Sequence, residues 1–524
     1  MPKHLPQWLA PLWRQMIIAL LCGVMMTLIY APFEHGLLVF FILPVWFYLI
    51  LRSQAPGKVG FAFGLGWFGA GISWVHVSIA DYGGVPLLVS LALMGLLCSY
   101  LALFPALFAR LLAWVNKHSQ QQLLPTLLAA PIFWYAVEYL RGVLLTGFPW
   151  LSLGYSQING SAHATHLIPI FGELGTSAWI VLVCICLTPA TNRYLWRHAI
   201  EPKSNGLFAL GLFLAVFMKY TNWQWEIEDP QQSVNLALVQ GNIPQSLRWV
   251  PEEDANTMNK YLSLTQALWD THDVIIWPEA AIPQLEPLAE DYLAALQQQS
   301  MASDTPLITG ILNYRVQTNE AFNNVIVIDK QYAYEHANRY AKHHLLPIGE
   351  FVPFEAVLRE LAPIFDLPMS SFTRGAYLQP NLQAGALSLT TALCYEILFA
   401  RQVRDNLTPK TNAILTLSND AWFGASHGPH QHMQIAQIRA LELGLPVIRA
   451  TNNGITGVID HFGQVTAQLE QFSTSHLSYA LPLKKRRTPY FHFGESINMI
   501  WLGILLMIAV YCMVSTRKQT LQSQ

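Results

Sequence analysis

The chain has 524 residues, of which 53% are hydrophobic and only 12% are charged, and its mean hydropathy is +0.31. These values exclude an ordinary soluble domain and predict that much of the chain lies in lipid. A formal charge of −2, together with 17 tryptophans, argues against a nucleic-acid-binding protein and suits wide apolar and interfacial surfaces.

Long apolar runs dominate the first 223 residues and recur near the carboxyl terminus. Most approach the roughly 20 residues that are needed to cross the hydrocarbon core of a bilayer. The runs are Met16–Phe33, Leu37–Leu51, Val59–Ile79, Pro86–Phe108, Leu123–Leu145, Leu167–Leu187, Gly206–Met218 and Ile497–Val514. They predict a membrane bundle of about eight transmembrane helices, in which the runs that begin at Leu37 and Gly206 are the weakest because they are short. The first run lacks a small-residue cleavage site, so it is interpreted as a retained span.

The placement of lysine and arginine predicts the orientation of these spans. With a cytoplasmic amino terminus, the inside loops hold Lys3, Arg14, Arg52, Lys58, Arg110, Lys117, Arg193, Arg197, Lys203, Arg517 and Lys518. The outside turns near Glu34, Asp81 and Ser156 hold none. This positive-inside pattern predicts that both termini are cytoplasmic and that the large segment before the last span faces away from the cytoplasm.

The segment from about residue 225 to residue 495 has the pattern of a globular α/β domain. Short β-branched or apolar runs alternate with helical patterns such as Asn256–Trp269 and His432–Leu443. This alternation predicts sheets covered by helices, with ligands at the carboxyl ends of the strands. We therefore divide the chain into a membrane domain (1–223), a candidate catalytic domain (224–495) and a final transmembrane helix with a cytoplasmic tail (496–524).

Cys394 is the one cysteine of six that lies outside the predicted spans, which argues against a disulfide framework. A lone cysteine is more often a small buried hydrophobe than a nucleophile. Cys394, however, follows the strand-like run Ala386–Leu393 and precedes the helix-like run Tyr395–Asn406, where a helix amino terminus would favour a thiolate. The sequence therefore predicts that Cys394 is an exposed nucleophile.

A cysteine nucleophile also needs a proton acceptor and a group that stabilises the tetrahedral oxyanion. Two segments of the sequence offer candidates for these roles. Glu279 follows a short strand that stops at Pro278, so it would project from the carboxyl end of the strand as a general base. Lys342 and Glu350 flank a Pro-Gly turn, so Lys342 would supply positive charge and Glu350 would orient it. Taken singly, each of these residues would be an ordinary exposed charge.

These motifs carry a family resemblance. Trp277-Pro-Glu279, the segment from Lys342 to Glu350, and Leu393-Cys394-Tyr395-Glu396 resemble, in this order, the Glu-Lys-Cys triad of the nitrilase (carbon–nitrogen hydrolase) superfamily. Within it, the chain resembles the apolipoprotein N-acyltransferase family through residues 71–74, 138–141, 147–150, 239–249, 418–424 and 449–454. The resemblance covers nearly the whole chain and implies a nitrilase-like αββα sandwich joined to the helical membrane bundle.

The resemblance also implies a reaction, a cellular location and a role for each candidate site residue. A fatty acyl chain would pass from a membrane phospholipid, typically phosphatidylethanolamine in that family, to the cysteine as a thioester. It would then pass to the amino-terminal amine of a diacylglyceryl-cysteine on an apolipoprotein. The family acts in the bacterial inner membrane with a periplasmic catalytic domain and needs no metal or other cofactor. In this chain the nucleophile would be Cys394, the general base Glu279 and the oxyanion stabiliser Lys342. Glu350 would fix Lys342, while Tyr395 and Glu396 would shape the elbow around the thiol.

Four aromatic residues, Trp150, Trp249, Trp422 and Phe423, are candidates for lining an acyl-chain pocket. Aromatic residues also lie at membrane interfaces without binding a substrate, and this alternative stays open for all four.

Three histidines, His427, His430 and His432, have a spacing that invites a metal-site hypothesis. No metal is predicted there, because metal sites usually add a carboxylate or a cysteine.

Polar and small residues in the predicted spans are given structural roles. Glu138 and Arg141 stand one helical turn apart in the fifth span and are expected to pair, because isolated charges are costly in lipid. Five glycines in the third span are expected to permit close helix packing. They are Gly60, Gly64, Gly66, Gly69 and Gly71.

Two other functions compete with acyl transfer. The first is a membrane-tethered amidase of nitrilase type, in which water resolves the acyl-enzyme; a large helical bundle argues against it. The second is a non-enzymatic lipid-binding or transport protein, whose charges would line the spans rather than cluster outside them. In this sequence only Glu138 and Arg141 fit that description.

Overall fold

The computed structural model describes residues 6–119, 123–159, 165–194, 202–220, 225–248, 250–347, 349–351 and 372–522. The chain divides into two compact units, which we call the helical unit (1–76, 86–224 and 488–524) and the sheet unit (77–85 and 225–487). Compared with the boundaries proposed from the sequence, residues 77–85 join the sheet unit and residues 488–495 join the helical unit.

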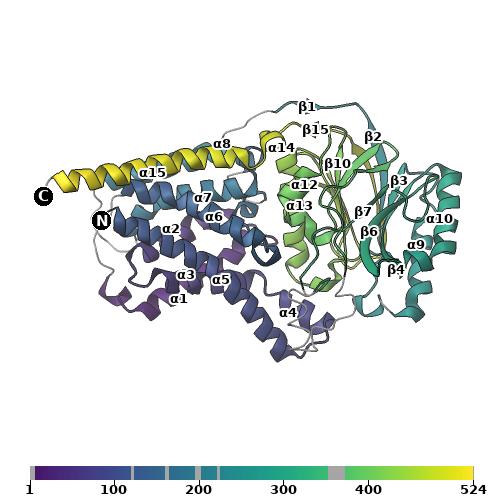
Figure 1. Cartoon of the computed structure of the whole chain (residues 1–524), viewed down its shortest axis with the longest axis horizontal. Helices are drawn as coiled ribbons and strands as arrows, with labels where there is room; N and C mark the ends of the chain where they lie inside the picture. Colours follow the sequence, from purple (N-terminus) through teal and green to yellow (C-terminus); the bar gives the residue numbers. More distant parts are fainter. Residues whose placement is uncertain are drawn as a thin grey trace. The chain divides into compact units, whose positions relative to one another are not determined.

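Apolar helices build the helical unit (Figure 1). They are α1 (Leu12–Met25), α2 (Val39–Arg52), α3 (Pro56–Gly71), α5 (Leu87–His118), α6 (Leu123–Val143), α7 (Ile168–Tyr194), α8 (Pro202–Tyr220), α14 (Pro489–Phe493) and α15 (Ser496–Gln522). Among the described residues, five helices are long and apolar enough to cross a membrane. A sixth joins them if α3 and the segment Val75–Asp81, bent by 62° from it, count as one span.

Two further apolar helices, Gly36–Arg52 and Gly206–Phe217, are shorter than a full span. They coincide with the two runs that the sequence marked as weakest. Each of the eight predicted runs thus falls on a helical segment, and the number that cross the membrane stays a prediction.

Glycines let α3 approach its neighbours closely. A Cβ atom at Gly60 would stand 2.6 Å from the carbonyl oxygen of Pro105 on α5, and one at Gly66 would overlap the carbonyl oxygen of Leu20 on α1. Close packing is therefore the role of these positions, as expected. At Gly69 a Cβ atom would meet nothing within 4 Å, so the expected packing role is wrong there.

Glu138 and Arg141 on α6 pair with each other and with backbone groups. Arg141 Nη2 lies 3.8 Å from Glu138 Oε1, which accepts a hydrogen bond of 2.9 Å from the backbone N–H of Leu153. The Arg141 guanidinium also donates to the carbonyl oxygens of Phe148 and Trp150. The pair therefore neutralises its own charge and fixes the segment that follows α6.

Among the described residues, the sheet unit contains two large sheets, four α-helices and a two-stranded sheet of β1 (Ile227–Glu228) and β15 (Lys485–Arg486). The larger sheet has the order β14 (Ser475–Pro482), β2 (Ser233–Gln240), β3 (Val274–Ile276), β5 (Leu307–Arg315), β6 (Glu320–Ile328) and β7 (Arg339–Ala341), with β4 (Ile282–Leu285) beside β5. The smaller sheet has the order β13 (Val465–Gln468), β12 (Gly457–Ile459), β11 (Val447–Thr451), β10 (Ala413–Ser418), β9 (Leu387–Thr391) and β8 (Leu382–Ala384). Strands β2, β3 and β5 run parallel, as do β9, β10 and β11.

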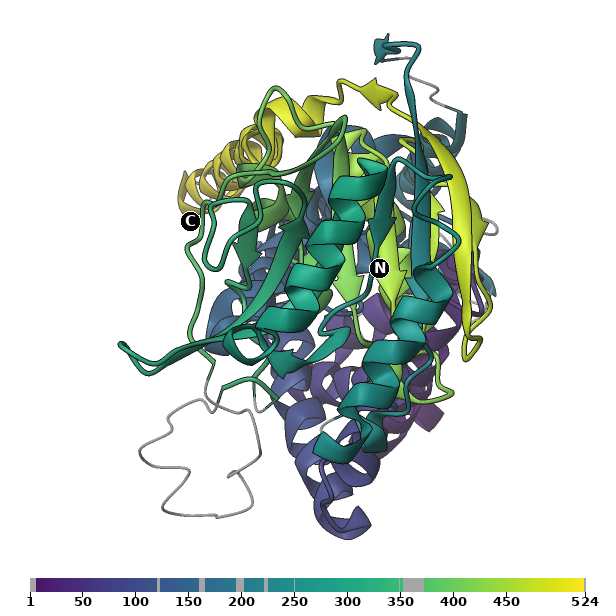
Figure 2. The same ribbon diagram turned by 90° about the vertical axis from the view of Figure 1, so that its right-hand side faces the viewer.

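The sheets and helices of this unit are stacked in four layers. The helices are α9 (Asp254–Thr265), α10 (Glu290–Ser303), α12 (Ala400–Asp405) and α13 (Gly428–Leu443). Figure 2 shows α9 and α10 over the outer face of the larger sheet, while α12 and α13 lie on the opposite side of the unit in Figure 1. The expected αββα sandwich is confirmed.

Alternating side chains of β2 show why the sheets are covered on both faces. Leu236 and Leu238 belong to the apolar core between the two sheets, whereas Ala237 and Val239 belong to the core beneath α9 and α10. Successive residues of a strand point to opposite faces, so a strand that is apolar throughout must be buried on both sides. The parallel strands consequently end in the interior of the unit, where polar side chains that follow them are shielded from water.

Candidate active site

Cys394 follows β9 and begins a short 3-10 helix, η12 (Cys394–Leu398). Its backbone adopts φ +53°, the left-handed region that costs a non-glycine residue about 1 kcal/mol or more. This strained turn projects the thiol from the end of the strand, and the residue keeps part of its surface exposed. Its Sγ atom lies 3.3 Å from Ser418 Oγ at the end of β10.

The protonation state of Cys394 differs from the expectation drawn from the sequence. Burial of the thiol and the neighbouring Glu279 carboxylate raise its pKa to about 12, and Lys342 only partly opposes them. The η12 helix is a single short turn, so its amino terminus does not outweigh these effects. The direction of this pKa shift opposes the expectation that the position favours a thiolate, so a nucleophilic attack by Cys394 would require a base that removes its proton.

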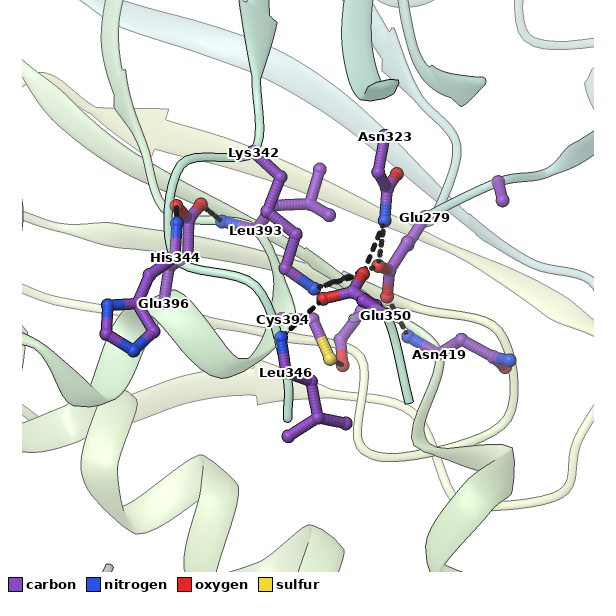
Figure 3. A network of polar contacts seen from close by, with 12 residues as sticks. Glu279, Asn323, Lys342, His344, Leu346, Glu350, Leu393, Cys394, Glu396 and Asn419 are labelled. Carbon is purple, nitrogen blue, oxygen red and sulfur yellow. Dashed lines mark hydrogen bonds and ion pairs between the residues drawn. The ribbon is translucent and has the colours of Figure 1, made fainter. Parts of the chain in front are cut away.

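Glu279 lies three residues beyond the end of β3 and is held as a hydrogen-bond acceptor (Figure 3). Its Oε1 atom accepts from Asn323 Nδ2 at 2.9 Å, and its Oε2 atom accepts from the backbone N–H of Asn419 at 2.9 Å. Its own carbonyl oxygen accepts from the Arg248 guanidinium. These contacts fix a buried carboxylate in one orientation, which is what a general base needs.

Lys342 follows β7 and is only 2% exposed. Its Nζ atom donates to Glu350 Oε1 at 2.8 Å and lies 3.7 Å from Glu279 Oε1. Burial alone would lower the pKa of Lys342, but the two carboxylates outweigh it and raise the pKa above its usual value. Lys342 is therefore a fixed cation. Glu350 is held in turn by Asn323 Nδ2 at 3.1 Å and by the N–H of Leu346 at 2.8 Å.

The structure brings Cys394, Glu279, Lys342 and Glu350 together, although they follow three different strands of two sheets. Figure 3 shows the thiol beside the ammonium of Lys342 and the two carboxylates. A thiol, a carboxylate acceptor and a buried cation in one place can carry out nucleophilic attack on a carbonyl group, proton transfer and stabilisation of the resulting oxyanion.

Glu396 lies away from the reacting groups and binds the backbone on both sides of them. Its carboxylate accepts five hydrogen bonds of 2.8–2.9 Å, from the N–H groups of His343, His344 and Leu393, from Gln402 Nε2 and from the hydroxyl of Tyr340. It thereby connects the chain that follows Lys342 to the residue that precedes Cys394. These hydrogen bonds tie the segment that carries Lys342 to the segment that carries Cys394.

Replacing Glu396 with glutamine should destabilise the protein by about 3 kcal/mol, because the amide nitrogen would face donors that now point at an oxygen. Thermal unfolding of the purified protein in detergent measures this effect. Glu252 is exposed, so Glu252→Gln serves as the control and should leave the melting temperature unchanged. Equal melting temperatures for both variants would contradict this role of Glu396.

Of the aromatic candidates, Trp422 and Phe423 lie together in the 3-10 helix η13 (Asp420–Phe423), and Trp422 is 37% exposed. Trp150 is buried within the helical unit. Trp249 lies outside the described residues. Tyr395 follows the nucleophile and packs its ring edge-on against Phe399, with 5.3 Å between ring centroids.

Sequence reasoning assigned no role to the two residues that donate to Glu279, which are Asn323 through its side-chain amide and Asn419 through its backbone N–H. Asn323 lies in β6, a strand otherwise rich in apolar residues, and it is 5% exposed. An amide in such a strand must find a hydrogen-bond partner, and this was the available signal. Within the described residues, no group of three His, Cys, Asp or Glu side chains is arranged to bind a metal ion.

Two family models match separate parts of the chain. Residues 22–186 match the apolipoprotein N-acyltransferase N-terminal domain, and residues 235–488 match the carbon-nitrogen hydrolase family. Among solved structures, a carbon-nitrogen hydrolase from Helicobacter pylori is 13% identical, with 51% of this chain and 93% of that chain covered and a TM-score of 0.36. A CN-hydrolase superfamily protein from Xanthomonas campestris is 16% identical, with coverages of 48% and 91% and a TM-score of 0.36.

Curated relatives match along nearly the whole chain, and each is named apolipoprotein N-acyltransferase. The relative from Photobacterium profundum is 43% identical over 505 residues, with 95% of both chains covered. The relative from Vibrio cholerae is 44% identical over 495 residues, with 93% of this chain and 95% of that chain covered. The relative from Haemophilus influenzae is 35% identical, with 94% of both chains covered. The chain therefore belongs to the apolipoprotein N-acyltransferase family.

Proposed function

We propose that this acyltransferase moves a fatty acyl chain from a membrane phospholipid to the amino-terminal amine of a diacylglyceryl-cysteine on an apolipoprotein, through a thioester on Cys394. The observation that carries the proposal is the convergence of the Cys394 thiol, the fixed carboxylate of Glu279 and the buried ammonium of Lys342. The proposed steps use no metal ion and no cofactor.

In the first step, Glu279 takes the proton of the Cys394 thiol while the sulfur attacks the ester carbonyl carbon of the phospholipid. The carbonyl oxygen becomes an oxyanion, which the ammonium of Lys342 stabilises at low dielectric. Collapse of this intermediate breaks the ester C–O bond. The lysophospholipid alkoxide leaves with the proton that Glu279 returns, and the acyl chain remains on sulfur.

In the second step, the free amine of the acceptor attacks the thioester carbonyl, and Lys342 again stabilises the oxyanion. Glu279 takes the proton that the amine loses, and the C–S bond breaks. The departing sulfur receives the proton from Glu279, which restores the thiol. Two bulky lipids thus use one site in turn, because a thioester is sufficiently activated for an amine to displace it.

The lipid nature of both substrates gives the helical unit a role beyond anchoring. Donor and acceptor keep their acyl chains in the bilayer, so the site must open to the lipid. We propose phosphatidylethanolamine as the donor and Trp150, Trp249, Trp422 and Phe423 as residues that line the path of the acyl chain. The exposed Trp422 supports this assignment most directly.

A reconstituted assay tests the acceptor. The purified protein is mixed with a phospholipid that carries a labelled acyl chain and with a synthetic peptide whose amino-terminal cysteine bears a diacylglyceryl group. Mass spectrometry should find the labelled chain in amide linkage on the peptide. Amino-terminal acetylation of the peptide should prevent the reaction. Release of labelled fatty acid alone, with the peptide unmodified, would instead support the alternative of a nitrilase-type hydrolase.

The proposed location of the catalytic domain, on the periplasmic face of the bacterial inner membrane, has a separate test. Gln317 lies exposed in the turn between β5 and β6, and Gln54 lies exposed in the loop between α2 and α3, which is predicted to be cytoplasmic. In a Cys394→Ala background, a membrane-impermeant maleimide should label Gln317→Cys in intact spheroplasts. Gln54→Cys should be labelled only after permeabilisation. The reverse pattern would contradict the proposed orientation.

A further inference from the structure

Four polar residues beneath Cys394 form a connected set that the steps above do not use. We propose that this set, Ser418, Asp420, His432 and Arg449, positions the nucleophile, with His432 holding the backbone of Cys394 and Ser418 holding its sulfur. We call it the positioning network. The inference rests on the proposed role of Cys394 as the nucleophile and adds four positioning residues to it.

Asp420 is the centre of the network. Ser418 Oγ donates to Asp420 Oδ1 at 2.6 Å, and Arg449 Nη2 donates to Asp420 Oδ2 at 2.6 Å. All four side chains are buried, with exposed fractions of 2% or less. They come from four elements, since Ser418 ends β10, Asp420 begins η13, His432 lies on α13 and Arg449 lies on β11. Charged and hydroxyl side chains are rarely buried unless they are paired. Here the paired groups reach Cys394 through Ser418 and His432.

The hydrogen bonds make His432 a donor to the backbone of Cys394. The carbonyl oxygen of Cys394 can only accept, so its contact of 3.1 Å with His432 Nε2 places a ring proton on Nε2. His432 Nδ1 lies 3.1 Å from Arg449 Nη2 and 3.2 Å from Asp420 Oδ1, so both residues hold the other side of the ring. Burial and the positive charge of Arg449 lower the pKa of His432, and Asp420 opposes them.

This hydrogen bond acts on a strained residue. Cys394 has φ +53°, and such a conformation persists only where surrounding contacts determine it. A hydrogen bond at its carbonyl oxygen fixes the plane of the next peptide. Because that peptide is trans, the N–H of Tyr395 must point away from His432. His432 therefore controls both the direction of the thiol and the direction of the adjacent backbone donor.

Ser418 links the network to the sulfur. Its single hydroxyl proton has two acceptors, Asp420 Oδ1 at 2.6 Å and Cys394 Sγ at 3.3 Å. While Cys394 is a thiol, the hydroxyl donates to the Asp420 carboxylate. When Glu279 removes the thiol proton, the hydroxyl can turn and donate to the thiolate, a charge-assisted hydrogen bond. Arg449 keeps Asp420 paired during this change.

Alkylation of Cys394 by iodoacetamide tests the link through Ser418 without any lipid substrate. The charged groups that act on the thiol include Glu279, Asp420, Lys342 and Arg248, and all four remain in Ser418→Ala. Loss of the hydroxyl should lower the alkylation rate at pH 9 by about 10-fold, because a hydrogen bond to a charged group is lost. Thr416→Val is the matched control, since Thr416 is equally buried two residues earlier on β10, and its rate should equal that of wild type.

Acylation of Cys394 by phospholipid tests the link through His432. Glutamine retains a donor and an acceptor, whereas leucine has neither. His432→Leu should therefore lower kcat for acylation about 10-fold or more with KM unchanged, and His432→Gln should restore most of the rate. Ser418→Ala should likewise lower kcat and leave KM unchanged.

The outcomes separate this inference from the function on which it rests. Equal acylation rates for His432→Leu and His432→Gln, or an unchanged alkylation rate in Ser418→Ala, would overturn the positioning network. A wild-type protein that is alkylated normally but is never acylated by phospholipid would overturn the proposed function. In that case a slower alkylation of Ser418→Ala would still support the link between Ser418 and the sulfur.

Discussion

Cys394→Ser should lower the rate of acyl transfer by at least ~10⁴-fold, because a buried hydroxyl is a far weaker nucleophile than a thiol and its alkoxide is harder to form. The change replaces one atom and preserves the hydrogen bond to Ser418, so the fold should be retained. The measurement is product formation from labelled phospholipid and the diacylglyceryl-cysteine peptide. A transporter or lipid-binding protein would keep its function in this variant.

Cys512→Ala is the matched control for that experiment. Cys512 is a partly exposed cysteine on α15, and it should be dispensable. If Cys394→Ser kept more than a small fraction of the wild-type rate while remaining folded, the sulfur of Cys394 would not be the nucleophile.

Glu279→Gln should lower acyl transfer by about 10³-fold at pH 7, within the range expected when a positioned general base is removed. Glutamine keeps the shape of the side chain and can still accept from Asn323 or from the N–H of Asn419. It cannot accept the thiol proton. The first-order rate of Cys394 acylation, followed by mass spectrometry, measures the loss, and Glu252→Gln should behave as wild type.

The pH dependence of the residual rate gives a sharper test. Without a base, only the thiolate that forms spontaneously can attack. Loss of the Glu279 charge lowers the pKa of Cys394 below its wild-type value of about 12, but burial of the thiol, the largest cause, still raises it. The thiolate fraction is therefore small at pH 7 and grows about tenfold for each pH unit below that pKa. The acylation rate of Glu279→Gln should rise in this way between pH 7 and pH 9, while the wild-type rate should change much less. Parallel profiles would contradict the role of Glu279.

The positions of the candidate site residues could be predicted because their signals are local. Glu279, Lys342 and Cys394 each follow a short strand, and strand ends are where an α/β domain gathers its polar side chains. The protonation state of Cys394 could not be predicted. It depends on burial and on carboxylates contributed by distant parts of the chain, and the sequence around Cys394 contains only the competing signal of a helix start.

The helices and the central strands of the fold could also be predicted from local patterns. Apolar runs revealed the helices, but the run Val59–Ile79 is bent by 62° after Gly71, and no proline or charge marks that break. Strand-like runs in the sequence coincide with β2, β3, β5, β6, β9, β10, β11 and β12, whereas the edge strands β7, β8, β13 and β14 lie outside them. In β13 and β14 the exposed faces carry polar residues, which interrupt the apolar pattern. The order of strands in the sheets arises from contacts between distant segments, which local patterns do not contain.

The acyl-enzyme is the central claim, and intact-mass spectrometry tests it most directly. The purified protein is incubated with one defined phospholipid and no acceptor, beside Cys394→Ala. We expect the wild type to gain the mass of one fatty acyl chain, hydroxylamine to remove it, and the variant to gain nothing. A wild type that binds the phospholipid but shows no added mass would contradict the thioester mechanism.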